Sequence, residues 1–206
     1  MKITLENISK NYNNKIIFKN FSQEFIDNFY AITGSNGSGK TTLLKIILGY
    51  ISPSDGKVTY YKGKSILENY IGFFSFAAPY QELIEELTLK ESINFHFKFL
   101  DTINNLSKKD ILKKIKLEEY SDIKIHNFSS GMKQRLKLGL ALYSDCKFTL
   151  IDEPCTNLDE NSIDWYHKTI NEVTKFKKII IATNNKDDFK KNEVNIIQLD
   201  QIKKNY

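Results

Sequence analysis

A glycine-rich segment at residues 34–42 has the composition of a phosphate-binding loop. It reads Gly-Ser-Asn-Gly-Ser-Gly-Lys-Thr-Thr and fits the pattern G-x-x-x-x-G-K-S/T. Its glycines let backbone N–H groups converge on phosphate oxygens, because no Cβ stands in the way. The side chain of Lys40 supplies a mobile cation for the β and γ phosphates, and the hydroxyl of Thr41 suits a Mg²⁺ shell. The segment therefore predicts a bound nucleoside triphosphate.

The sequence on either side of the loop supports this interpretation. The apolar residues Phe29 to Thr33 predict a strand before the loop, and an amphipathic helix is expected from Thr41 to Gly49. The start of that helix points its positive dipole end at an anion. Lys40 is expected to act in catalysis as well as in binding. The expected nucleotide-binding residues of the loop are Gly34, Ser35, Asn36, Gly37, Ser38, Gly39, Lys40, Thr41 and Thr42.

Two carboxylates end a second apolar stretch. Phe148 to Ile151 predicts a buried strand, and Asp152 and Glu153 follow it directly. Acidic groups at the end of a buried strand are costly unless a neighbouring charge compensates for them. Beside Mg²⁺ and phosphate the placement makes sense: Asp152 is expected to hold the metal together with Thr41, and Glu153 to polarise the attacking water as a general base.

The order of the motifs resembles that of the ATP-binding cassette (ABC) ATPases over nearly the whole chain. After the phosphate loop come Phe-Ser-Ser-Gly-Met-Lys-Gln-Arg at 128–135, Leu-Ile-Asp-Glu-Pro at 150–154 and Asn-Leu-Asp at 157–159. The segment 128–135 is similar to the family signature L-S-G-G-Q, with Ser129 and Gly131 kept. The resemblance implies that Ser129 and Gly131 cap the γ-phosphate held by the phosphate loop of a second cassette.

Local physical chemistry agrees with parts of this resemblance. Ser129 is suited to cap a helix from Gly131 to about Tyr143, which leaves N–H groups and a helix dipole to meet phosphate. The resemblance also implies that Tyr12 stacks on adenine, although a tyrosine near a strand end also serves as simple packing. Asp159 matches an aspartate that links the two sites across the dimer, and it equally fits a helix N-cap.

Two positions depart from the family pattern. Asn184 stands where the family usually has a histidine that contacts the γ-phosphate. The amide of Asn184 can still donate a hydrogen bond, but this side chain is shorter than that of histidine and cannot become cationic. The substitution therefore predicts slow hydrolysis. The position of the family's Q-loop glutamine falls on Phe76. Gln81 is the candidate substitute, either as a group that reaches the metal or as an ordinary loop residue, and both alternatives stay open. This loop is where the family receives its membrane subunit.

The predicted strands and helices, which must position these groups, together indicate an α/β fold. We expect a P-loop NTPase core with a mainly parallel sheet, an N-terminal antiparallel β part and an inserted helical subdomain. We expect a single domain over residues 1–206, with the helical subdomain at about 79–145. The predicted strands span residues 3–8, 16–18, 21–25, 29–33, 58–61, 69–76, 148–151, 179–182 and 194–199. Beyond the helices named above, the predicted ones span about 88–100, 107–116 and 159–176.

Composition limits the class of protein. The chain has 206 residues, 41% hydrophobic and 27% charged, as is ordinary for a soluble globular protein. No apolar run approaches bilayer length and Met1 to Glu6 lacks a signal core, so we expect a cytoplasmic location. The net charge of +5 is mild, and no nucleic-acid partner is expected. Cys146 and Cys155 lack metal-ligand spacing and are expected to be reduced bystanders.

The resemblance implies the ATPase subunit of an ABC transporter. Such a chain dimerises around two Mg·ATP, with a homodimer expected and a heterodimer left open, and it drives a separate integral membrane subunit. It would then lie peripherally on the inner face of the cell membrane. The alternative is a nucleotide-gated regulatory module with weak or no hydrolysis, and Asn184 and Phe76 are the residues that motivate it.

Overall fold

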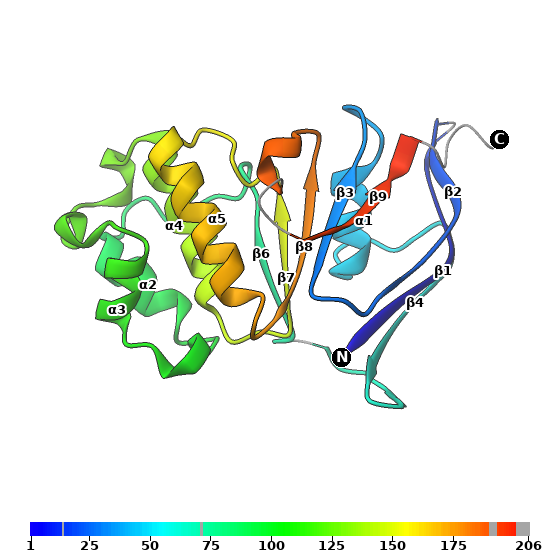
Figure 1. The fold of residues 1–206 in the computed structure, drawn as a ribbon, viewed down its shortest axis with the longest axis horizontal. Helices are drawn as coiled ribbons and strands as arrows, with labels where there is room; N and C mark the ends of the chain where they lie inside the picture. The colour runs from blue at the N-terminus through cyan, green and yellow to red at the C-terminus, as the bar shows by residue number, and fades with distance from the viewer. Residues whose placement is uncertain (14, 71, 190–192, 201–206) are drawn as a thin grey trace.

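Two β-sheets of different kinds form the frame of the chain (Figure 1). The computed structural model describes residues 1–13, 15–70, 72–189 and 193–200. One sheet is antiparallel, in the order β2 (Lys15–Phe25), β1 (Lys2–Tyr12), β4 (Asp55–Lys62) and β5 (Ser65–Ile66). The other is parallel, in the order β6 (Phe74–Ala77), β7 (Phe148–Asp152), β8 (Lys178–Thr183), β3 (Phe29–Thr33) and β9 (Asn195–Gln198).

The inner strands of the parallel sheet are buried on both faces. This is why β3, β7 and β8 are almost entirely apolar and show no alternation with polar residues. Strand β8 lies between β7 and β3, and Ala182 is the register partner of both Ile32 and Asp152. The carboxyl ends of β3 and β7 therefore meet at one edge of the sheet, where the segments that follow them come together.

Helices cover both faces of this sheet (Figure 1). On one face, α1 (Lys40–Ile47) packs against side chains such as Leu150 and Ile180. On the other face, α4 (Ser130–Tyr143) and α5 (Glu160–Val173) pack against side chains such as Ile151 and Ile181. Successive residues of a strand point to opposite faces, so a single strand serves both cores. The start of α1 and the start of α4 consequently belong to different layers of the molecule.

The helical part between β6 and α4 consists of short elements. Helices α2 (Leu89–His96) and α3 (Lys108–Lys114) each begin with a capping box, Thr88 with Glu91 and Ser107 with Asp110. Both helices end earlier than the sequence predicts: α2 ends at His96, and α3 ends at Lys114, just before Lys116, whose φ of 54° is incompatible with a continuing helix. Short 3₁₀ turns at 103–105, 118–120 and 125–127 follow them. Within the described part of the chain, no helix combines the length and apolar character that crossing a membrane requires.

Two sequence predictions about strands are corrected by the structure. The strands expected at residues 16–18 and 21–25 are one strand, β2, because the interruption is a bulge region in which Asn20 has a φ of 51°. The strand expected at residues 69–76 begins only at Phe74. Before it, the ring of Tyr70 packs on that of Tyr60 with centroids 4.1 Å apart, so aromatic residues there serve packing and not a strand.

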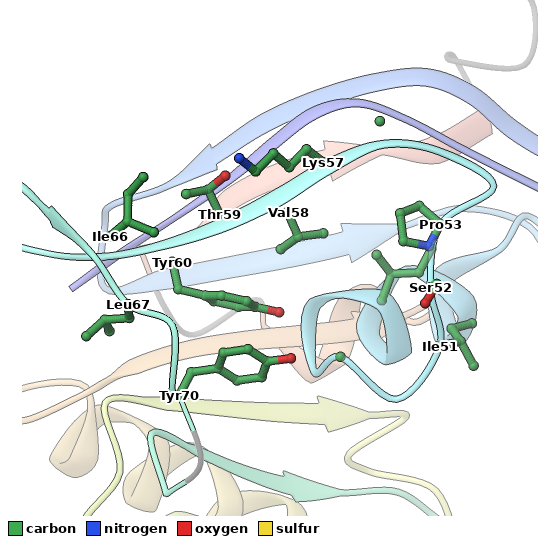
Figure 2. A pocket seen from close by; sticks show the side chains of 13 residues that line it. Ile51, Ser52, Pro53, Lys57, Val58, Thr59, Tyr60, Ile66, Leu67 and Tyr70 are labelled. Carbon is green, nitrogen blue, oxygen red and sulfur yellow. The ribbon is translucent and has the colours of Figure 1, made fainter.

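Tyr60 joins the antiparallel sheet to the end of α1. Its hydroxyl donates a hydrogen bond of 2.9 Å to the backbone oxygen of Ile47. Figure 2 shows the side chains of Tyr60 and Tyr70 lying side by side and pointing toward the last turn of α1. They border a hollow of about 430 Å³ that also includes Ile51, Pro53 and Leu67 but no residue of the phosphate loop. This contact fixes the far end of the helix whose start follows the predicted phosphate loop.

We predict that Gly139→Ala destabilises the protein by up to about 2 kcal/mol. Gly139 lies within α4, and an added Cβ would collide with Cγ2 of the fully buried Ile115. Overpacking costs about 1–3 kcal/mol, and the better helix propensity of alanine returns about 1 kcal/mol. Equilibrium unfolding in urea measures the change. In an Ile115→Ala background the collision is absent, so Gly139→Ala should become stabilising; the same sign in both backgrounds would contradict this account.

Candidate functional site

The predicted phosphate loop forms the connection between β3 and α1. Gly37 and Gly39 have φ values of 76° and 105°, which residues with a Cβ adopt only under strain. At Gly39 a Cβ would also collide with Ile17 and Phe18 of β2. The chain thus turns tightly enough for α1 to begin at Lys40, with its N-terminus open toward the loop. Of the nine predicted residues, Gly34 to Gly39 form this turn at the carboxyl edge of the sheet, and Lys40, Thr41 and Thr42 form the first turn of α1.

Polar groups of the loop are directed inward. The ammonium of Lys40 is largely buried and donates to the backbone oxygens of Gly34 at 2.9 Å and Ser35 at 3.3 Å. The hydroxyl of Ser38 is buried and has no hydrogen-bond partner among the described residues. A buried donor without a partner is costly unless a ligand completes it. The loop therefore offers a cation and a spare hydroxyl, as an anion such as a phosphate requires.

Asp152 sits at the end of β7 and shares a hydrogen-bond network with the loop. Its side-chain atom Oδ2 accepts bonds from the Thr41 hydroxyl at 2.6 Å and the Tyr80 hydroxyl at 3.3 Å. Its other oxygen, Oδ1, is buried with no partner in the described part of the chain. Burial raises the pKa of Asp152, and the bonds from Thr41 and Tyr80 oppose that rise. A buried carboxylate with one unused oxygen next to a threonine hydroxyl fits a Mg²⁺ ion.

Glu153 turns out of the strand toward the loop. It has a φ of 46°, and its N–H donates to the backbone oxygen of Ala182 at 2.8 Å. Its side chain borders a hollow of about 370 Å³ above the loop; the hollow is lined by Lys15, Ile17, Asn36, Gly37, Gly39, Lys40, Thr41, Thr42 and Glu153. Burial raises the pKa of Glu153 and the charge of Lys40 lowers it. A carboxylate with a raised pKa is a better proton acceptor for an attacking water.

Asn184 and Tyr12 approach the same region from other strands. The side-chain amide of Asn184, just after β8, donates to the side-chain oxygen of Asn36 in the loop at 2.9 Å. Tyr12 ends β1 and is 48% exposed, with its cross-strand partner Lys15 lining the hollow above the loop. The ammonium of Lys10 lies 5.0 Å from the centroid of the Tyr12 ring, and the stacking of this ring on a base stays a prediction.

Ser129 and Gly131 do not reach the phosphate loop of their own chain. Ser129 caps α4 by accepting a bond of 3.2 Å from the N–H of Met132, and its residue is exposed. A Cβ at Gly131 would approach the backbone oxygen of Asn157. Asp159 caps α5 through the N–H of Ser162 at 2.7 Å. Because α4 covers the opposite face of the sheet from α1, these groups lie apart from the phosphate loop, and their part in a nucleotide site stays a prediction.

From the loop after β6, the residue that hydrogen-bonds to Asp152 is Tyr80, which is one position before the predicted Gln81. Gln81 is exposed and borders another hollow, together with Glu82, Lys133 and Lys137. Its metal contact stays a prediction. The ring of Phe76, at the family's glutamine position, packs edge-on against Tyr50 with centroids 6.1 Å apart. The sequence signal for Tyr80 was the turn-forming Pro79 before it, which sequence reasoning did not use.

Sequence reasoning also missed Asp200. Its carboxylate accepts bonds from the Ser35 N–H at 2.7 Å and the Ser35 hydroxyl at 2.8 Å. Asp200 follows β9, which pairs with β3. Only the strand order reveals this contact, because the two residues are 165 positions apart in the sequence.

Comparisons with known proteins agree with this geometry. Residues 26–156 match the family described as ABC transporter. The chain is 32% identical over 194 residues to an uncharacterized ABC transporter ATP-binding protein, YybJ of Bacillus subtilis, and the alignment covers 90% of this chain and 87% of the relative. The fold is similar to an ATP-binding subunit of an ABC transporter, with a TM-score of 0.79 and 24% identity, over 97% of this chain and 87% of that one.

A second solved structure extends the comparison of folds. The cassette MJ0796, described as a dimer in a post-hydrolysis state with ADP and phosphate, has a TM-score of 0.77 at 23% identity and covers 96% of this chain and 94% of its own. The family match spans well over half of the chain, and YybJ is covered almost entirely. The chain therefore belongs to the ABC transporter family, as one of its ATP-binding subunits.

Proposed function

We propose that the chain binds Mg·ATP on its phosphate loop, hydrolyses it slowly and uses the cycle to drive a separate membrane subunit. The observation that carries this proposal is the convergence of Lys40, Thr41, Asp152 and Glu153 at one edge of the parallel sheet. ATP binding and the ATPase class follow from the family. The roles of individual residues, the metal and the rate are inferred from the geometry.

Each side chain has a distinct chemical task in this proposal. Thr41 and the unused oxygen of Asp152 would hold Mg²⁺, which when bound neutralises charge on the β and γ phosphates. Lys40 leaves its bonds to the loop carbonyls and pairs with the same phosphates. Glu153 orients a water and accepts its proton as that water attacks the γ-phosphate. The amide of Asn184 donates to a γ-phosphate oxygen.

A second cassette completes each site. The capped start of α4, with Ser129 and Gly131, lies on the opposite face of the sheet from the phosphate loop and cannot fold back onto it. The N-terminus of this 14-residue helix is suited to an anion, which in a facing copy would be the γ-phosphate. The dimeric state of the structural neighbour MJ0796 supports the same arrangement. The simplest assembly is a homodimer with two ATP between the subunits.

The membrane partner is an integral membrane protein that this chain binds from the inner face of the membrane. The relatives' description as ABC transporter ATP-binding proteins supports it. The site geometry also limits the rate, because Asn184 offers one short, neutral donor where the family usually has a histidine. Slow basal hydrolysis follows, with nucleotide binding intact.

We predict that Glu153→Gln lowers the turnover number for ATP by about a hundredfold or more and leaves ATP binding intact. The amide keeps the shape of the carboxylate but cannot accept a proton, and general base catalysis is worth roughly 10²–10⁴ in rate. Phosphate release measures turnover, and size-exclusion chromatography with Mg·ATP shows whether a dimer accumulates. Glu160→Gln, at the exposed start of α5, is the matched control. Wild-type turnover in the Glu153→Gln protein would overturn the assignment.

We predict that Asn184→His raises the turnover number by about tenfold. The imidazole of histidine reaches further than the asparagine amide and carries a charge when protonated. A well-placed donor to a developing charge is worth roughly 10²–10³ in rate, and Asn184 already supplies part of that effect. Steady-state phosphate release measures the effect. Asn185→His places the same ring one residue later, where the wild-type side chain caps a 3₁₀ turn, and should not accelerate the reaction. Equal rates in the two variants would refute the proposed role of Asn184.

A further inference from the structure

We propose that Tyr80 is a positioning residue for the metal-binding carboxylate: its hydroxyl and that of Thr41 together hold Oδ2 of Asp152, so that Oδ1 is presented to Mg²⁺. This inference rests on the proposed function, since it concerns the same Mg·ATP site. Tyr80 thereby contacts the metal site from the loop after β6, the same loop in which the sequence leaves open whether Gln81 reaches the metal.

A tight turn delivers Tyr80 to this place. Strand β6 runs parallel to β7, and its last residue, Ala77, is the register partner of Ile151, the residue before Asp152. Directly afterwards the chain reverses, with the N–H of Gln81 donating to the backbone oxygen of Ala78 at 3.1 Å. Pro79 occupies the second position of this turn, where its fixed φ is favourable. Tyr80 is third, and its hydroxyl reaches back to Asp152.

The turn and the tyrosine ring are held by contacts with other elements. The ammonium of Lys137 on α4 donates to the backbone oxygen of Pro79 at 2.6 Å. The ring of Tyr80 lies against Phe76, with centroids 6.4 Å apart, and the ammonium of Lys45 on α1 lies 5.0 Å from its centroid. Tyr80 is 52% exposed, so these contacts fix its direction and do not bury it in a core. A side chain held in this way, with its hydroxyl on a buried carboxylate, points to a role in the site.

The hydrogen-bond pattern at Asp152 shows what the hydroxyl does. Both donors, Thr41 and Tyr80, meet the same oxygen, and the other oxygen has no partner within the described residues although it is buried. Two donors on one oxygen fix the rotation of the carboxylate about its last bond, and groups that orient a metal ligand in this way tune metal affinity. Gln81 has its side chain on the exposed side of the turn, beside Lys133 and Lys137.

The experiment measures ATP affinity by calorimetry, once with Mg²⁺ and once with the metal chelated. Tyr80→Phe removes only the hydroxyl and keeps the ring on Phe76 and Lys45. We expect Tyr80→Phe to weaken Mg·ATP binding about tenfold, because removing a group that hydrogen-bonds to a metal ligand lowers metal affinity by about this factor. ATP binding without metal should be unchanged. Tyr50→Phe removes a hydroxyl from the same aromatic cluster, and Gln81→Ala removes the alternative ligand; both should bind Mg·ATP like the wild type.

The outcomes separate the two proposals. The proposed role of Tyr80 would be overturned if Tyr80→Phe bound Mg·ATP as tightly as the wild type. It would also be overturned if the variant lost ATP affinity equally with and without metal, because such a loss indicates a packing effect. A loss confined to Gln81→Ala would assign the contact to Gln81. If the wild-type protein bound ATP with no dependence on Mg²⁺, the proposed metal site would itself fail. Thermal unfolding midpoints of all variants within a few degrees of the wild type show that folding is intact.

Discussion

The register of β8 between β7 and β3 is the constraint on which the nucleotide site depends. Ala182 pairs with Ile32 on one side and with Asp152 on the other, so the phosphate loop and the two carboxylates leave the sheet at the same level. A slip of one residue would turn Asp152 to the other face and would also exchange the side chains of the two cores. Ile179, Ile180 and Ile181 of β8 are fully buried, and their apolar packing fixes the register. The same packing therefore fixes the distance between the Thr41 hydroxyl and the Asp152 carboxylate.

Burial on both faces has a second consequence, which concerns assembly. A sheet covered by α1 on one side and by α4 and α5 on the other has its phosphate loop and its signature helix start in different layers. Each of them ends in groups that favour an anion, yet they cannot meet around one anion within the chain. In the proposed function, a second cassette would bring a phosphate loop to the exposed, capped start of α4, and the layer structure is compatible with that arrangement.

Sequence reasoning succeeded where a signal is local. The loop glycines, the buried strands and the N-caps Ser129 and Asp159 each depend on a few adjacent residues, and the structure has the corresponding turns, strands and caps. It failed where distant segments decide. In the sequence, the bulge at Asn20 looks like the end of a strand. Only the pairing with β1 shows that β2 continues through it. Tyr80 and Asp200 could not be assigned, since strand order alone brings them to Asp152 and Ser35.

These two residues show that all five strands of the parallel sheet contribute to its carboxyl edge. Strand β3 supplies the phosphate loop, β7 the carboxylates and β8 Asn184, while the outer strands β6 and β9 lead to Tyr80 and Asp200. The outer contributions contact protein groups of the site, Asp152 and Ser35. The two hydrogen bonds from Ser35 to the carboxylate of Asp200 tie the start of the phosphate loop to the segment that follows β9. In the proposed function, the inner strands carry the groups that meet the nucleotide, and the outer strands lead to residues that hydrogen-bond to those groups.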